Sequence, residues 1–303
     1  MEILIKLYRK SEHNLHAMYL ISSRKDMNDG RIFAEKDRIV QFGGLGQGRP
    51  ITKDWFLSQL SSEKVLVLVH GFNNPFLYAV REFMLARVRI QRSFGDEYEH
   101  ILGYTWPSGS SEFDYFHAKR NTGEAGNRFR TWLRWLTKAG CTIDIMGHSM
   151  AALVGYKALR EEADIRIRNL FSLGAAIPTD ILLKDQKMGP LLEKVHCFYA
   201  FHNRNDSILK YGFRLVEWKK ALGYAGPSHQ QDLLKRHAKI NVIDCSGVVQ
   251  NHTDYLHSPS VLQLISQLLK GYKIGQHTRL SDYVSMPSSA EQIESRYAMA
   301  SQI

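Results

Sequence analysis

Residues 143–152 read Ile-Asp-Ile-Met-Gly-His-Ser-Met-Ala-Ala, and this stretch decides the fold that we expect. An alternating apolar segment runs into a Gly-x-Ser-x-Ala sequence, and a helical pattern follows directly. That order is typical of a nucleophile elbow, a tight turn from strand to helix that presents a serine hydroxyl at the edge of a sheet. The small residues Gly147 and Ala151 let strand and helix approach each other without a clash. The sequence therefore predicts that Ser149 is a nucleophile.

A serine hydroxyl is a weak nucleophile until a neighbouring base takes its proton. The helix that follows Ser149 also directs backbone N–H groups at the oxygen on which negative charge develops. The Gly-x-Ser-x-Ala sequence by itself occurs in many unrelated chains. Assigning a role to Ser149 therefore needs three further segments, which supply a second oxyanion donor, an acid and a base.

The oxyanion donor is expected after residues 65–69, which read Val-Leu-Val-Leu-Val. A continuous run of this kind predicts a strand that is buried on both faces of a parallel sheet. We expect the N–H groups of Phe72 and Met150 to form the oxyanion hole. The loop after the strand is expected to line the site with His70, Gly71 and Asn73. The alternative is that His70-Gly71 only makes a turn.

The acid is expected after a buried strand at residues 195–201, in a polar loop that carries Asp206. An acid just past the carboxyl end of a strand reaches a histidine on a neighbouring loop, where it holds the imidazole tautomer and stabilises the imidazolium. The alternative role for Asp206 is to cap the short helix that begins at Ser207. Asp180, which follows the preceding strand, is the second candidate for the acid.

The base is expected after the strand at residues 240–245, in a polar loop that carries His252. A general base must come within hydrogen-bond reach of the hydroxyl, and a loop after the last core strand delivers it. His257 is the competitor, but it lies directly before a helix start at Ser258-Pro259. We therefore assign the base to His252.

These segments belong to an alternation of strands and helices along the chain. Strands are expected near residues 2–8, 17–22, 38–42, 65–70, 100–106, 142–147, 168–173, 195–201 and 240–245. Helices are expected near residues 51–61, 75–93, 122–138, 149–162, 179–193 and 259–271. The alternation predicts the α/β class, with a mostly parallel central sheet covered by helices on both faces. Because the carboxyl ends of parallel strands share one edge, Ser149, Phe72, Asp206 and His252 are expected to meet there.

The order Ser149, Asp206, His252 is the Ser…Asp…His order of α/β-hydrolases, and the chain resembles that superfamily. It is similar, more narrowly, to a bacterial α/β-hydrolase group of unknown function, over about residues 60–270. The resemblance rests on Val69–Asn74, Tyr104–Ser108, Gly147–Met150 and Asn251–Tyr255. It implies a serine hydrolase and no particular substrate. Trp106, which follows another expected strand, and His148, next to the nucleophile, are expected to border the site. Ala151 stands where many relatives have glycine.

The 303 residues are expected to form one α/β-hydrolase domain over residues 1–275, in which residues 1–60 supply strands that extend the sheet. Residues 276–303 are expected to be a mobile tail. No room exists between residues 175 and 194 for a large lid. The stretch 211–238 is therefore expected to wall the site, with its aromatic residues packed mainly against the core.

The chain carries a formal charge of +10 at pH 7, yet its basic residues are spread out. The densest stretch, from Lys119 to Arg134, alternates with aromatic residues and is interpreted as the solvated face of a helix. No nucleic-acid-binding module, metal-ligand spacing or cofactor motif is recognised. No apolar run of membrane-spanning length and no secretory signal are seen, so a cytoplasmic location is expected.

We expect a hydrolase that cleaves a small-molecule or lipid carboxylic ester, or a thioester, through a Ser-His-Asp triad and an acyl-enzyme, without a cofactor. Two alternatives stay open. One is a binding or effector module on a hydrolase scaffold, since one fold hosts many functions. The other is an amide-directed hydrolase, because esters and amides pass through similar tetrahedral intermediates.

Overall fold

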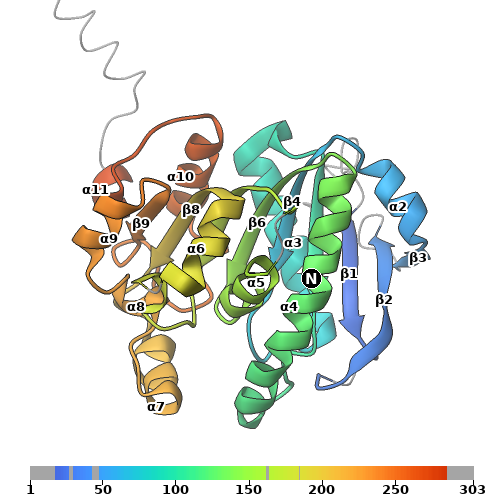
Figure 1. The fold of residues 1–303 in the computed structure, drawn as a ribbon, viewed down its shortest axis with the longest axis horizontal. Helices are drawn as coiled ribbons and strands as arrows, with labels where there is room; N and C mark the ends of the chain where they lie inside the picture. The colour runs from blue at the N-terminus through green and yellow to red at the C-terminus, as the bar shows by residue number, and fades with distance from the viewer. Residues whose placement is uncertain (1–17, 27–29, 43–47, 162–163, 184, 285–303) are drawn as a thin grey trace, which may run out of the picture.

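A computed structural model describes residues 18–26, 30–42, 48–161, 164–183 and 185–284. Within these residues ten strands form one sheet, in the order β10-β9-β8-β7-β6-β4-β5-β1-β2-β3 (Figure 1). The strands are β1 (Met18–Arg24), β2 (Phe33–Phe42), β3 (Arg49–Ile51), β4 (Lys64–Val69), β5 (His100–Thr105), β6 (Thr142–His148), β7 (Ile167–Leu173), β8 (Val195–His202), β9 (Ile240–Asp244) and β10 (His277–Arg279). Neighbouring strands from β10 to β1 are parallel, whereas β1-β2 and β2-β3 are antiparallel.

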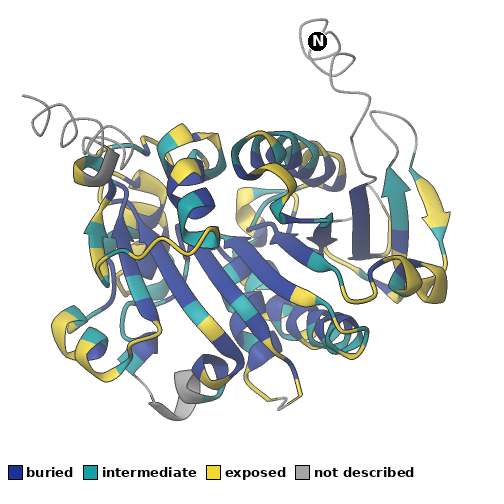
Figure 2. Ribbon diagram, turned by 90° about the horizontal axis from the view of Figure 1, so that it is seen from above, coloured by how far each residue is buried: buried dark blue, intermediate teal, exposed yellow. Residues whose placement is uncertain are grey.

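Helices cover both faces of this sheet, which confirms the fold class expected from the sequence. They are α2 (Lys53–Gln59), α3 (Phe76–Phe94), α4 (Tyr115–Lys138), α5 (Ala151–Leu159), α6 (Asp185–Lys194), α7 (Arg214–Glu217), α8 (Leu222–Ala225), α9 (Gln230–Arg236), α10 (Pro259–Leu269) and α11 (Leu280–Val284). The core on one face includes side chains of α2, α4, α5 and α6, and the core on the other includes side chains of α3 and α10. In Figure 2 the two helical layers flank central strands that are mostly buried, whereas β2 and β3 at one edge are largely intermediate or exposed.

Strand β4 shows how the apolar run produces a two-sided core. Val65, Val67 and Val69 join the cluster with α4 and α5, and Leu66 and Leu68 join the cluster with α3 and α10. All five side chains are buried, because successive residues of a strand point to opposite faces. A strand covered by helices on both sides needs apolar residues at every position, as the sequence predicted.

The described chain continues in regular structure past the expected boundary at residue 275. Strand β10 pairs in parallel with β9, and Leu280 of α11 is buried in the core with α3 and α10. A strand of three residues is too short to show a period of two, so the sequence pattern did not reveal it. Strands β1, β2 and β3 extend the other edge of the sheet, as expected for the first 60 residues. The strand expected at residues 2–8 lies outside the described residues.

Helix α4 begins seven residues earlier than expected, at Tyr115 instead of residue 122. A 3-10 turn, Glu112–Asp114, leads directly into α4, and the Asp114 Oδ2 caps that turn by accepting the N–H groups of Ser110 at 2.9 Å and Ser111 at 3.1 Å. Such a carboxylate satisfies N–H groups that lack a partner at the start of a helix. None of the helices described is long and apolar enough to cross a membrane.

Candidate active site

Ser149 lies in the turn between β6 and α5, at the carboxyl edge of the sheet. Its φ of +58° is left-handed, a strained backbone conformation for a residue with a side chain. Two bonds hold the turn: the Ser149 N–H donates to the Leu173 carbonyl at 2.9 Å, and the Ala176 N–H donates to the Ser149 carbonyl at 3.1 Å. A Cβ on Gly147 would lie 3.3 Å from the Cβ of Ala151, so small residues are needed at both positions.

His252 approaches Ser149 from the loop after β9, as the sequence predicted. Its Nε2 lies 2.8 Å from the Ser149 Oγ, and both side chains are buried. His257, the competing histidine, lies 3.6 Å from the Glu82 carboxylate instead. The structure therefore brings His252 and not His257 to the hydroxyl.

Asp206 completes a chain of three side chains, because its Oδ2 lies 2.6 Å from His252 Nδ1. Its Oδ1 accepts the Leu209 N–H at 2.9 Å, so the capping role that the sequence left as an alternative is also present. One oxygen holds the imidazole and the other holds the first turn after Ser207. With Nδ1–H donated to the carboxylate, the Nε2 lone pair of His252 faces the Ser149 hydroxyl. Asp180 instead forms an ion pair with Lys219 at 3.1 Å.

His148 fixes the backbone of the loop that carries His252. Its Nε2 lies 2.8 Å from the His252 carbonyl oxygen, and the two imidazole rings are 4.6 Å apart between centroids. Burial, followed by the nearby His252 ring, lowers the pKa of His148 to about 3. The neutral ring therefore donates its Nε2–H to the carbonyl at ordinary pH. The sequence placed His148 beside the site, and the structure adds this contact.

The loop from His70 to Asn73 passes directly over Ser149. A Cβ on Gly71 would lie 2.9 Å from the Ser149 Cβ and 3.0 Å from the His148 carbonyl oxygen, so only glycine fits without a shift. The Asn73 N–H donates to the Ser108 carbonyl at 2.9 Å, which ties the loop to the segment after β5. In the described part of the chain, the N–H groups of Phe72 and Met150 donate to no other protein group. Both are therefore available to a ligand oxygen.

His70 stabilises this loop from behind. Its Nδ1 lies 2.9 Å from the Gly71 carbonyl oxygen, and its Nε2 lies 3.0 Å from the Thr105 Oγ1. Burial and then the Arg24 charge hold the pKa of His70 well below its usual range. A neutral His70 donates from Nδ1 to the carbonyl and accepts at Nε2.

Trp106 does not line the site, which corrects the expectation from the sequence. Its side chain is fully buried, and its ring stacks on His70 at 5.8 Å with an interplanar angle of 3°. The indole Nε1–H donates to the His70 carbonyl at 3.0 Å. Trp106 follows a strand that ends at the site, but its side chain points to the core side of the loop.

Arg24 is a supporting residue that sequence analysis missed. It ends β1, is fully buried, and donates from Nε to Thr105 Oγ1 at 2.8 Å and from Nη2 to the Asn74 carbonyl at 2.5 Å. Its guanidinium therefore ties the strand ends of β1 and β5 to the loop that carries Phe72. An arginine after an apolar run is ordinarily exposed, so the sequence carried no signal of this role.

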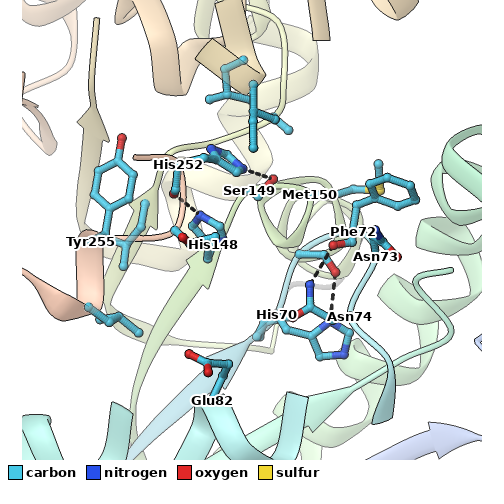
Figure 3. A pocket seen from close by; sticks show the side chains of 18 of the residues that line it. His70, Phe72, Asn73, Asn74, Glu82, His148, Ser149, Met150, His252 and Tyr255 are labelled. Atoms are coloured by element: carbon cyan, nitrogen blue, oxygen red, sulfur yellow. Dashed lines mark hydrogen bonds between the residues drawn. The ribbon is translucent and has the colours of Figure 1, made fainter. Parts of the chain in front are cut away.

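A cavity of about 610 Å³ opens at Ser149 (Figure 3). One set of walls comes from α3 and the loop after His252, with the residues Tyr78, Glu82, Phe83, Ala86, Arg89, Leu256 and His257. The other comes from Tyr115 and the helical segment 208–216, with the residues Ile208, Leu209, Gly212, Phe213 and Val216. His70, Gly71, Asn73 and His148 also line it, as expected. The walls are mainly apolar, which suits an apolar substrate.

Residues 211–238 were expected to cover the site, and only part of this stretch does so. Phe213 lines the cavity, and Leu222 and Leu233 are buried in the core. Leu215 and Trp218 contact neither, because their side chains are 74% and 87% exposed. Within the part of the chain that the structure describes, no cluster of three His, Cys, Asp or Glu residues is placed to hold a metal ion.

The chain was compared with protein families, curated proteins and solved structures. A family model described as alpha/beta hydrolase of unknown function (DUF900) matches residues 51–268. No curated protein matches the chain. A solved structure of LpqC, poly(3-hydroxybutyrate) depolymerase from Bordetella parapertussis, is similar with a TM-score of 0.48 and 14% identity, over 96% of both chains.

Two further solved structures are similar. One is a putative hydrolase of the alpha/beta superfamily from Xanthomonas campestris pv. campestris, with a TM-score of 0.38 and 17% identity, over 69% of this chain and 99% of that chain. The other is an uncharacterized protein from Bacillus cereus ATCC 10987, with a TM-score of 0.43 and 13% identity, over 70% of this chain. The match spans 61% of the length of the Bacillus protein.

Proposed function

The chain belongs to the family of alpha/beta hydrolases of unknown function (DUF900), and from that premise we propose that it is a serine hydrolase that cleaves carboxylic esters through an acyl-enzyme. One observation carries the proposal. Two short contacts, of 2.8 Å and 2.6 Å, connect the Ser149 hydroxyl through His252 to the buried carboxylate of Asp206. This arrangement makes a serine hydroxyl nucleophilic at neutral pH.

In the acylation step, the Ser149 Oγ attacks the ester carbonyl carbon while His252 Nε2 takes the hydroxyl proton. Asp206 keeps the Nδ1–H of His252 oriented and stabilises the imidazolium that forms. The imidazolium then gives its proton to the leaving alcohol, and the acyl group stays on Ser149. A water molecule, deprotonated by His252, then attacks the acyl carbon. The bond to the Ser149 Oγ breaks, His252 returns the proton to that oxygen, and the carboxylic acid is released.

The tetrahedral intermediate carries a negative oxygen, and the N–H groups of Phe72 and Met150 are the proposed donors to it. One such donor contributes about 3–4 kcal/mol to stabilising the transition state in comparable sites. Rigidity matters because a donor that must move into place loses part of this effect. His70, Trp106 and Arg24 supply the rigidity for Phe72, through the contacts described above.

The substrate class follows from the walls of the cavity. Phe83, Ala86 and Leu256 on one side and Phe213 and Val216 on the other offer apolar surface to both parts of an ester. Apolar walls favour acyl groups that are themselves apolar, as in lipid esters and acyl thioesters. The 610 Å³ cavity has the volume of a site for a small molecule.

Substitution of Ser149 by alanine tests the proposal, with hydrolysis of p-nitrophenyl butyrate as the assay. We expect kcat to fall at least about 10⁴-fold, because the nucleophile is lost. Ser172→Ala is the matched control, since the Ser172 Oγ is buried on the neighbouring strand and finds no hydrogen-bond partner among the described residues. A folded Ser149→Ala protein that retains wild-type activity refutes the assignment. A wild-type protein with no activity on esters favours a binding module.

A further inference from the structure

The helical segment Ile208–Trp218 has two apolar faces. Its inner face places Leu209 and Phe213 in a small buried cluster beside the cavity. Its outer face exposes Ile208, Tyr211, Leu215 and Trp218, whose side chains are 56%, 59%, 74% and 87% exposed. Packing of the fold uses only the inner face. Ile208 also lines the cavity, whereas Tyr211, Leu215 and Trp218 neither line it nor belong to a buried cluster of the described chain.

A second exposed apolar group adjoins this stripe at the start of α4. Phe113 and Phe116 are 96% and 69% exposed. The two segments are joined by the Glu217 carboxylate, which accepts the Tyr115 hydroxyl at 2.8 Å and Lys119 Nζ at 2.6 Å. Figure 1 shows α7 and the first turn of α4 projecting on the same side of the molecule. We call these exposed side chains the apolar rim: Phe113, Phe116, Ile208, Tyr211, Leu215 and Trp218.

The apolar rim surrounds part of the mouth of the cavity. Glu112 and Tyr115 line the cavity from one segment of the rim, and Gly212 and Val216 line it from the other. Exposed apolar patches on a soluble protein mark sites of interaction with a partner or a membrane. A partner bound to the rim therefore lies next to the entrance to Ser149.

Charge selects the kind of partner. Residues 207–220 contain four basic side chains and one acidic side chain. The acidic one, Glu217, is held by Tyr115 and Lys119, and the basic Lys219 pairs with Asp180 at 3.1 Å, so the positive charge of the segment comes from Lys210, Arg214 and Lys220. The Lys210 ammonium lies 5.0 Å from the centroid of the Tyr211 ring, so basic and aromatic groups alternate along the surface. A second copy of the chain would bring the same positive surface against this one. An anionic surface complements it.

Trp218 occupies the tip of this segment in a conformation that favours glycine. It is the C-cap of α7, with a φ of +55°. A tryptophan there incurs backbone strain and exposes an indole, with no gain from packing in the monomer. Indole rings are enriched where protein meets the interface of a lipid bilayer, and basic side chains attract anionic head groups.

We propose that the apolar rim docks on the surface of an anionic phospholipid bilayer. Trp218, Leu215 and Phe113 insert among the lipids, while Lys210 and Arg214 contact the phosphate groups. The docking places the mouth of the cavity against the bilayer. It goes beyond the proposed ester hydrolysis and does not depend on it, because no side chain of the triad takes part.

Flotation with lipid vesicles tests the docking on the full-length protein. Vesicles of phosphatidylcholine alone are compared with vesicles that also contain phosphatidylglycerol. We expect the wild type to float with the anionic vesicles and to be released by salt. The Leu215→Ser/Trp218→Ser variant is expected to bind at least about tenfold more weakly, as is Lys210→Gln/Arg214→Gln. The matched control is Tyr272→Ser, which removes an aromatic ring that is 51% exposed after α10.

The outcomes separate docking from catalysis. Ser149→Ala is expected to float like the wild type, and Leu215→Ser/Trp218→Ser is expected to hydrolyse a short soluble ester at the wild-type rate, since neither side chain lines the cavity. The proposal is overturned if the wild type stays unbound, if it binds neutral vesicles equally well, or if the Leu215→Ser/Trp218→Ser variant binds like the wild type. A wild-type dimer in solution that this variant dissociates also overturns it and assigns the rim to a second copy.

Discussion

Replacing Asp206 by asparagine keeps the shape of the side chain and removes one of two acceptor oxygens. In the native site Oδ2 pairs with His252 Nδ1 at 2.6 Å, and Oδ1 accepts the Leu209 N–H at 2.9 Å. An asparagine side chain has one acceptor oxygen and an NH₂ group that only donates. It therefore cannot satisfy both partners, and each of its two orientations has a different defect.

In the first orientation the NH₂ group faces His252 and donates to Nδ1. The imidazole proton is then forced onto Nε2, which can no longer accept the proton of Ser149. In the second orientation the oxygen faces His252, so the NH₂ group opposes the Leu209 N–H inside the protein. An unsatisfied buried donor costs about 1–3 kcal/mol, and the charge that stabilises the imidazolium is lost as well. The first orientation is therefore expected to dominate.

A histidine held in the wrong tautomer lowers kcat about 10⁴-fold in comparable triads, which corresponds to about 5.5 kcal/mol of the barrier. We expect a loss of about 10³–10⁴ in kcat on p-nitrophenyl butyrate, with KM nearly unchanged. Circular dichroism and thermal melting establish that the variant is folded. Asp180→Asn is the control, because Asp180 pairs with Lys219 and does not contact His252. A folded Asp206→Asn enzyme with wild-type kcat would refute the assigned role.

Gly71, His148 and the buried His202 each allow a further test. Gly71→Ala is expected to lower the free energy of unfolding by about 1–3 kcal/mol and to remove most of the activity, because its Cβ would lie 2.9 Å from the Cβ of Ser149. The control Gly155→Ala has open space around its Cβ and is expected to keep both stability and activity. Equal behaviour of the two variants in thermal melting and kinetics contradicts this prediction. His148→Phe removes the hydrogen bond to the His252 carbonyl and is expected to lower kcat about tenfold. His148→Gln supplies a side-chain donor again and is expected to recover the lost kcat. If His148→Gln is as slow as His148→Phe, His148 has a different role. Burial lowers the pKa of His202 to about 4. Between pH 6.5 and pH 4 this histidine is therefore protonated in the unfolded chain and neutral in the folded chain. The free energy of unfolding consequently falls as the pH drops through this range. At pH 5 this group lowers the free energy of unfolding by about 2 kcal/mol. In urea titrations, the free energy of unfolding of His202→Leu is expected to fall between pH 7 and pH 5 by about 2 kcal/mol less than that of the wild type. An equal fall in the two proteins contradicts the prediction.

The residues of the candidate site could be predicted because topology places them together. Ser149, Phe72, Asp206 and His252 each follow a parallel strand, and the carboxyl ends of such strands share one edge. Each apolar strand can be recognised from its own sequence, so the residues that follow the strands, and that meet at one edge of the sheet, can be predicted as well. The choice between His252 and His257 also needed only position, since a residue at a helix start is less free to reach the neighbouring turn.

Other features depend on packing that the sequence does not encode locally. Trp106 follows a strand as Ser149 does, yet its side chain turns to the core and stacks on His70. The burial of Arg24 depends on the neighbouring ends of β5 and the loop at Asn74, which lie far away in the chain. The exposure of Trp218 depends on where α7 ends and on the left-handed backbone of its cap, with a φ of +55°, which the sequence pattern does not reveal. The positions of Trp106 and Arg24 are fixed by contacts over long sequence separations.

Labelling with a fluorophosphonate, followed by peptide mass spectrometry, tests the reactivity of the serine most directly. This reagent forms a stable covalent adduct only with a serine that a neighbouring base activates. We expect one adduct, on the peptide that contains Ser149, and we expect His252→Ala to slow its formation strongly. An unlabelled folded protein, or an adduct on a different serine, would contradict the proposed mechanism.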